Sequence, residues 1–162
     1  MDKKFVKIVL LLFFINTFLS FPEEEKIVEI SASIKPYRIM RGEGGKIILN
    51  MRLKKGNYIS SAPLLNIEIK SNDGLAFSKN FYTSSDLNIP VIEKDGIKIL
   101  DVKSHFEIPF KVKEEARPGF KKIEMEIKFF VYSLKSNLCI KYSNKISSGY
   151  YIRSKIFRKK IS

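Results

Sequence analysis

The sequence has little of the side-chain chemistry from which self-contained active sites are built. Its 162 residues include one cysteine, one histidine and no tryptophan. One cysteine cannot form an internal disulfide or a cysteine zinc site, and one histidine removes most metal and catalytic-triad arrangements. The glycine-rich stretch from Arg41 to Gly45 lacks the spacing of a phosphate-binding loop. The sequence therefore argues against a metalloenzyme, a self-contained hydrolase and a nucleotide-binding enzyme, and we expect no cofactor and no metal.

Acidic residues are scarce as well. The chain has 30 lysines and arginines against 17 aspartates and glutamates, which gives a formal net charge of +13. A surface with this excess attracts anionic partners. Hydrophobic residues make up 44% of the chain, and glycines and prolines number only eight and six. This is the composition of one folded domain rather than of a linker.

Residues 1–20 differ from the rest of the chain. Three lysines precede an unbroken apolar run from Ile8 to Ile15, and acidic residues return at Glu23. A basic start followed by a short apolar run is typical of an export signal, and the run is shorter than the roughly twenty residues that a membrane span needs. We therefore expect residues 1–20 to be a signal peptide, and the protein to be exported to the periplasm or cell envelope. Phe18 stands where a small residue is preferred before the cleavage site, so an uncleaved anchor is the alternative.

After the signal, apolar and polar residues alternate with a period of two. The clearest case is Ile123, Met125 and Ile127, which alternate with Glu124 and Glu126. This period is typical of a strand with one buried face. The same alternation occurs in four further segments, at residues 28–34, 47–53, 65–69 and 106–112. No window of comparable length supports a helical period as well.

Turn residues separate these segments. Lys55–Gly56–Asn57 and Asp95–Gly96 are two of the turn signals. Short strands at such spacing predict an antiparallel β-sandwich of about seven strands, which we place at residues 23–153. Pro109 has no N–H to donate, so we expect the strand at 106–112 to lie at or near a sheet edge.

The order of features from Lys46 to about Ile146 resembles that of one family. The resemblance rests on four stretches, which are Leu53–Ser61, Asn80–Thr83, Phe106–Val112 with Glu114–Gly119, and Val131–Cys139. The family is the amino-terminal periplasmic domain of the thiol:disulfide interchange protein DsbD. The resemblance implies an immunoglobulin-like β-sandwich that passes reducing equivalents to periplasmic partners.

The resemblance also implies roles for particular residues. Phe81 and Tyr82 lie where the family has a cap loop, in which an aromatic ring shields two redox cysteines. Cys139 corresponds to the second of these cysteines, and Ser133 or Leu134 stands in place of the first. A dithiol reductase needs a second thiol to resolve its mixed disulfide. We therefore expect a thiol:disulfide interchange domain that depends on a partner, or a degenerate one.

Three interpretations of Cys139 remain open at this point. It is a buried and inert thiol, or it pairs with the cysteine of a second copy, or it is a reactive thiol that forms a mixed disulfide with an envelope protein. Lys135 and Lys141 are the candidates to stabilise its thiolate. The alternative function is a non-enzymatic interaction module of the envelope, which holds a protein or an anionic membrane surface.

The basic excess concentrates at the C-terminal end. From Lys141 to Ser162 the chain has seven lysines and arginines and no acidic residue. We expect residues 154–162 to form a basic tail that is either solvated or in contact with an anionic membrane surface. An exported chain seldom meets nucleic acid, so we expect no nucleic-acid partner. His105 is expected to be a solvated strand residue rather than a general base.

Overall fold

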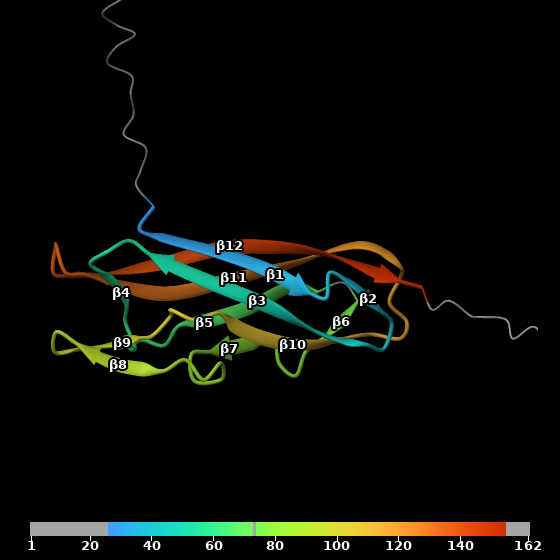
Figure 1. The fold of residues 1–162 in the computed structure, drawn as a ribbon, viewed down its shortest axis with the longest axis horizontal. Coiled ribbons are helices and arrows are strands. Elements are labelled where there is room, and N and C mark those ends of the chain that lie inside the picture. Colours follow the sequence, from blue (N-terminus) through green and yellow to red (C-terminus); the bar gives the residue numbers. More distant parts are fainter. Residues whose placement is uncertain (1–25, 73, 155–162) are drawn as a thin grey trace, which may run out of the picture.

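The computed structural model describes residues 26–72 and 74–154 (Figure 1). The expected signal peptide at 1–20 lies outside the described residues. So does the expected basic tail at 154–162, apart from Ser154.

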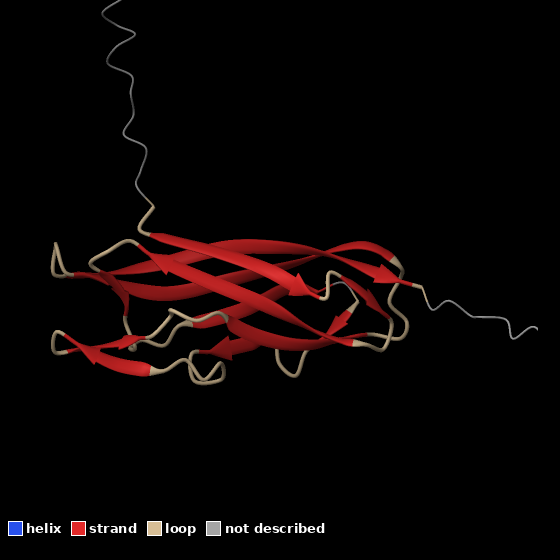
Figure 2. Cartoon of the chain, viewed as in Figure 1, coloured by secondary structure: helices blue, strands red, loops and turns tan. Residues whose placement is uncertain are grey.

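Strands account for most of the described residues, and they form two facing sheets and one hairpin (Figure 2). The first sheet has four strands, in the order β1 (Val28–Lys35), β3 (Gly44–Leu53), β10 (Phe106–Val112) and β6 (Leu75–Ala76). The second sheet has the order β2 (Arg38–Met40), β12 (Leu138–Arg153), β11 (Gly119–Ser133), β5 (Asn66–Asn72) and β7 (Phe81–Thr83), and β4 (Asn57–Ile59) also pairs with β11. The hairpin consists of β8 (Val91–Lys94) and β9 (Ile97–Leu100).

The connectivity is that of an immunoglobulin-like sandwich. β1 pairs antiparallel with β3 in the first sheet, and the chain then crosses so that β2 pairs parallel with the end of β12 in the second sheet. In immunoglobulin nomenclature the first sheet corresponds to A-B-E with the short β6 beside E, and the second to A′-G-F-C with β7 in the position of C′. The prediction of an all-β, immunoglobulin-like antiparallel sandwich is confirmed.

The alternating pattern decides which face of each strand is buried. In β11 the side chains of Ile123, Met125, Ile127 and Phe129 are at most 1% exposed, and the residues between them point away from the core. β10 alternates in the same way, with Ile108 fully buried. Each such side chain contributes about 1.5–3 kcal/mol by burial, before chain entropy is subtracted. The sandwich therefore has a continuous apolar core.

The predicted strands are present, and the structure adds several short ones. The described residues form twelve strands, against the expected seven or so. The additional strands β2, β4, β6 and β7 have two or three residues each. The Asp95–Gly96 turn closes the β8–β9 hairpin with φ values of 53° and 76°, as a type I′ turn requires.

Pro109 lies where one side of β10 has no strand partner in the described chain, as its missing N–H requires. It is opposite Lys46 of β3 on one side of β10. On the other side β6 covers only Lys111 and Val112, so in the described chain no strand pairs with Pro109 there. The prediction for this strand is confirmed.

Candidate functional site

The longest ribbon of the molecule is the β11–β12 hairpin. Its two strands pair without interruption from Gly119 and Ile152 to Ser133 and Leu138. The turn at its tip is held by several hydrogen bonds. The backbone N–H of Asn137 donates to the carbonyl of Ser133 over 2.9 Å, and the hydroxyl of Tyr132 donates to the side-chain oxygen of Asn137. The tip is therefore a fixed part of the fold.

The outward edge of β12 is largely unpaired. Among the described residues only β2 pairs with this edge, and it covers Tyr151 to Arg153 alone. We call the part from Leu138 to Gly149 the open edge. An open edge of this length is a template for a further strand, because its outward N–H and C=O groups have no strand partner among the described residues.

The direction of these backbone groups follows from the register. The N–H of Tyr151 donates away from β11, to the carbonyl of Tyr37, over 2.9 Å. In an antiparallel ladder every second residue points the same way. Since the pairing with β11 has no bulge, the backbone groups of Cys139, Lys141 and Ser143 also point outward. The same holds for Lys145 and Ser147.

The side chains of the open edge form two rows. Ile140, Tyr142 and Ile146 lie on the inner face of the sheet, because they are opposite the buried residues of β11. Towards the tip the first sheet no longer covers this row, so that Leu138 is 57% and Ile140 44% exposed. Tyr142 is better covered and stacks on Phe129 with ring centroids 5.8 Å apart. The open edge therefore presents apolar surface together with backbone donors and acceptors.

A groove of about 550 Å³ runs between the open edge and β1. Residues 26–30 line one side, and Tyr142, Asn144, Lys145 and Ile146 line the other. Figure 1 shows β1 and β12 running side by side along the same border of the sandwich. A strand added to β12 at this border would direct every second side chain towards the groove.

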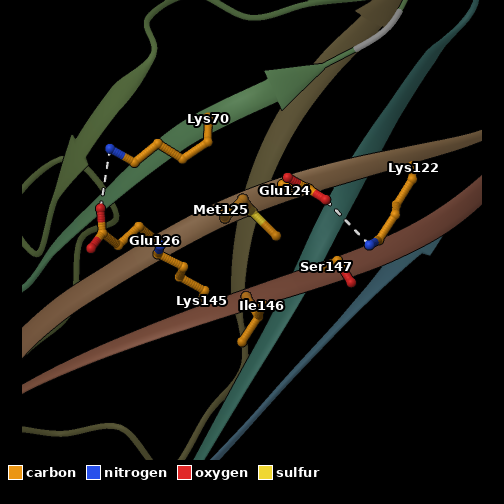
Figure 3. A pocket seen from close by; sticks show the side chains of 8 residues that line it. All are labelled: Lys70, Lys122, Glu124, Met125, Glu126, Lys145, Ile146 and Ser147. Carbon is orange, nitrogen blue, oxygen red and sulfur yellow. Dashed lines mark hydrogen bonds and ion pairs between the residues drawn. The ribbon is translucent and has the colours of Figure 1, made fainter.

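The outward face next to the open edge carries a compensated group of charges (Figure 3). Glu126 of β11 receives a hydrogen bond from the Ser143 hydroxyl at 2.9 Å and lies 3.1 Å from the ammonium of Lys70 and 3.3 Å from that of Lys128. The lysine at position 70 and the hydroxyl lower the pKa of Glu126 to about 2. Glu126 and Lys70 line a shallow depression of about 480 Å³, together with the Glu124–Lys122 pair and Lys145. Both of its carboxylates are paired with lysines, so it does not resemble an acid–base site.

Two cations of the open edge are not part of that group. Neither Lys141 nor Lys145 forms an ion pair with any described residue. Both side chains are exposed on the outward face, on the same row as Ser143. The open edge is therefore positively charged.

Cys139 is exposed and lies on the open edge. The interpretation of this residue as a buried thiol is therefore wrong. It is opposite Tyr132, and Lys141 follows on the same row of β12. Lys135 lies in the turn between the two strands. The structure thus brings Lys141 and Cys139 onto one face, near the tip.

The predicted cap residues lie elsewhere. Phe81 and Tyr82 belong to β7, which is separated from β12 by both β5 and β11. They pair with Glu68 and Ile67, which are opposite the middle of β11 rather than its tip. The structure therefore does not place them over Cys139. Tyr82 is instead buried in the core, where its hydroxyl lies 3.3 Å from that of Ser78.

The remaining candidates give no catalytic arrangement. His105 is 54% exposed, and its Nε2 lies 3.3 Å from a carboxylate oxygen of Glu107. That carboxylate also pairs with Lys46 at 2.8 Å, which lowers the pKa of Glu107. In the described ranges no three His, Cys, Asp or Glu side chains come together as metal ligands. Nor do those ranges contain a helix with the length and hydrophobicity to span a membrane.

The open edge itself was not predicted from the sequence. Cys139 and the hairpin were identified, but the exposure of Leu138 and Ile140 was not. The alternation of Ile140, Tyr142 and Ile146 with polar residues was a usable signal for a strand after the turn.

Comparisons with known proteins concern the fold. No family model matches the chain, and no curated protein does. The chain is similar to a protein of unknown function from Porphyromonas gingivalis W83, with a TM-score of 0.45 and 10% identity over 81% of this chain and 50% of that one. A cohesin module of a family 33 glycoside hydrolase from Clostridium perfringens ATCC13124 has a TM-score of 0.41 and 12% identity over 80% and 98%.

A third similar structure is BcpA, the major pilin subunit of Bacillus cereus. Its TM-score is 0.40 and its identity 11%, over 77% of this chain and 39% of the pilin. The chain thus spans half of the Porphyromonas protein and 39% of the pilin. At such values the likeness carries no conclusion about function. The resemblance to the DsbD domain stays a prediction.

Proposed function

We propose that the protein is a non-enzymatic binding module of the cell envelope, which takes up an extended segment of another exported protein by strand addition to β12. The observation that carries this proposal is the open edge, whose outward backbone groups from Leu138 to Gly149 have no strand partner among the described residues. Added strands obtain affinity from main-chain hydrogen bonds and specificity from alternate side chains.

The two rows of side chains define the partner. On the inner face an added strand meets Ile140, Tyr142 and the groove next to β1, which favours apolar residues. On the outward face it meets Lys141 and Lys145, which favours acidic residues because opposite charges across a strand pair are stabilising. The partner we propose is therefore an extended segment in which apolar and acidic residues alternate.

Labelled peptides test this proposal directly. We expect a short peptide of alternating valine and glutamate to bind the full chain, as measured by fluorescence anisotropy. A matched peptide of alternating valine and lysine should not bind, and raised salt should weaken the first complex. Equal binding of the two peptides, or of neither, would contradict the proposal.

A proline placed in the open edge provides the second part of the test. Ser143→Pro removes an outward N–H and leaves the bonds to β11 in place, because proline is tolerated where the N–H faces solvent. Ser143→Ala is the matched control, since both variants lose the hydroxyl bond to Glu126. We expect Ser143→Pro to weaken peptide binding about tenfold relative to Ser143→Ala. Thermal melting of both variants shows whether the fold is kept.

A second candidate function is the formation of a mixed disulfide at Cys139, which its exposure on the open edge favours. In that reaction the Cys139 thiolate attacks a disulfide of the partner. One new S–S bond forms as the partner's S–S bond breaks, and the second sulfur of the partner leaves as a thiolate. The test is to isolate envelope complexes under non-reducing conditions. We expect a reductant-sensitive complex with the wild type, and Cys139→Ser should abolish it.

Both candidates presuppose export. We infer export from residues 1–20, which have a basic start followed by an apolar run. The intact mass of the protein purified from an envelope fraction tests it, because cleavage removes the mass of that segment. Recovery of the full-length chain from the cytoplasm alone would contradict it.

A further inference from the structure

A cleft lies at the same end of the molecule as the hairpin tip, but on another surface. Its walls are the end of β3, the strand β4, the hairpin β8–β9 and the segment after β9 (Figure 1). Its volume is about 480 Å³. This lies within the range of roughly 300–1,000 Å³ in which small-molecule sites are found. We call it the β4/β9 cleft.

The walls of the β4/β9 cleft are fixed by backbone contacts. Ser60 forms an antiparallel bridge with Ile99. The hydroxyl of Ser61 donates to the carbonyl of Lys98 over 3.0 Å, and the backbone N–H of Asp101 donates to the carbonyl of Pro90 over 2.8 Å. The first two contacts join β9 to the segment after β4, and the third closes the base of the β8–β9 hairpin. The cleft is therefore formed before any ligand arrives.

The floor of the β4/β9 cleft is apolar. Met51, Ile59, Ile99 and Leu100 line it, and each is at most 6% exposed. Half-buried side chains of Leu53, Ile92 and Val102 form the accessible part of the wall. An apolar ligand placed here would remove further carbon surface from water, which is favourable.

The rim of the β4/β9 cleft is cationic. Arg52, Lys94 and Lys103 are exposed there, against the single carboxylate of Asp101. That carboxylate accepts a hydrogen bond from the backbone N–H of Lys103 at 3.3 Å. The ammonium of Lys94 lies 4.6 Å from the centre of the Tyr58 ring, and both residues line the cleft.

From this combination we propose that the β4/β9 cleft binds a small amphiphile with an apolar body and one carboxylate, of the class of medium-chain alkanoates. The alkyl chain lies against the apolar floor, and the carboxylate meets the basic rim. A cationic amphiphile is disfavoured because three of the four charged rim residues are positive. The site does not depend on strand addition to β12.

A chain-length series tests the proposal on the full chain. The probe is an apolar fluorescent sulfonate that reports an occupied apolar site, and the competitors are hexanoate, octanoate, decanoate, decanol and decylammonium below their micelle concentrations. We expect affinity to rise about fourfold for each methylene until the cleft is filled. Decanoate should compete better than decanol, and decylammonium worst. Equal competition by decanoate and decylammonium would overturn the proposal.

Variants of the rim locate the site. The triple variant Arg52→Gln, Lys94→Gln and Lys103→Gln should weaken decanoate about tenfold and leave decanol unchanged. The matched control is Lys111→Gln, Lys113→Gln and Arg117→Gln, three exposed cations that do not line the cleft. It has the same net charge and should bind like the wild type. The same loss in both variants would show a general charge effect and refute the site.

Two further variants separate this site from the open edge. Ile92→Trp should fill the β4/β9 cleft and weaken both decanoate and decanol, since Ile92 is a half-buried wall residue. Ser143→Pro should leave decanoate binding unchanged. Unaltered decanoate binding by a folded Ile92→Trp variant would mean that the alkanoate binds elsewhere.

Discussion

The two borders of the second sheet are built in opposite ways. At one border, β7 has three residues, and the loop that follows is tied back to it. Asp86 accepts bonds from the backbone N–H and the hydroxyl of Thr83 at 2.8 and 3.0 Å and lies 2.6 Å from the ammonium of Lys79. At the other border, β12 has sixteen residues, and on its side away from β11 only the last three have a strand partner in the described chain. The strand at the first border is short and is hydrogen-bonded to the loop that follows it, whereas most of the strand at the second border has no outward strand partner in the described chain.

This contrast bears on function. Proteins commonly protect sheet edges with short strands and covering loops, because an exposed edge invites pairing with other chains. The border at β7 shows that this fold uses both devices. The open edge at β12 has neither device in the described chain, which supports the proposed binding surface.

The largest expected effect comes from a core residue in β11, which lies between the two borders of the second sheet. Ile127 is fully buried between Ile67 of β5 and Asn144 of β12. We expect Ile127→Ala to lower the free energy of unfolding by about 2–5 kcal/mol, through lost burial and the cavity that remains. Ile140→Ala on the open edge should cost less than about 1 kcal/mol because this side chain is already 44% exposed. Urea unfolding measures both, and similar losses would mean that the open edge is covered in solution.

The next prediction concerns the closed border. Asp86→Ala removes the acceptor for the Thr83 N–H and the partner of Lys79. We expect the amides of β7 to exchange with solvent more than tenfold faster, by local opening, while those of β11 keep their protection. Hydrogen exchange followed by mass spectrometry or NMR measures this. Unchanged exchange at Thr83 would show that the loop does not close this border.

A pH series sharpens the comparison between the charges of the two regions. The pKa of Asp86 is lowered from 3.8 to about 2, chiefly by Lys79, and that of Glu126 from 4.5 to about 2, chiefly by Lys70. Both carboxylates are more acidic in the folded state than in the unfolded state. Their contribution to stability is therefore complete above about pH 4.5 and is lost as the pH falls towards 2. We expect Glu126→Gln and Asp86→Asn each to flatten the fall in urea midpoint over this window.

The smallest expected effect concerns Cys139. Because the residue is exposed, the folded and reduced protein should react with an anionic aromatic disulfide without denaturant. Lys141→Gln should slow this reaction severalfold at low salt, since Lys141 lies on the same row of β12. Lys111→Gln, far along the chain in β10, is the control for net charge. Equal rates for the two variants would remove Lys141 from the candidates.

The long strands were predictable because one face of each is apolar and the other is polar. The segment at residues 106–112 coincides with β10, and the alternation around Ile127 identified β11. Such strands have one face in the core, so apolar and polar residues alternate along their sequence. The strands of two or three residues, such as β4 and β7, are too short to show a period. Their existence depends on pairing with distant strands, which no local pattern reveals.

The candidate site was predicted only in part. The sequence pointed to Cys139 and the hairpin, but the openness of the edge depends on where β2 pairs, and this is set by the crossing of the chain after β1. The placement of Phe81 and Tyr82 over the cysteine rested on the resemblance to the family's cap loop, which was drawn from the order of features along the chain. Order does not determine position in a sheet, and β7 joined the border remote from β12.

The parallel pairing of β2 with the end of β12 has a mechanical consequence. The described chain begins at one end of the long axis and leaves at the other (Figure 1). Tension applied between those ends would pull β2 and β12 in opposite directions along their length, so that the bonds joining them share the load in shear instead of breaking one after another. An optical-tweezers experiment should therefore find a higher rupture force between these ends than across the two strands of the β11–β12 ribbon.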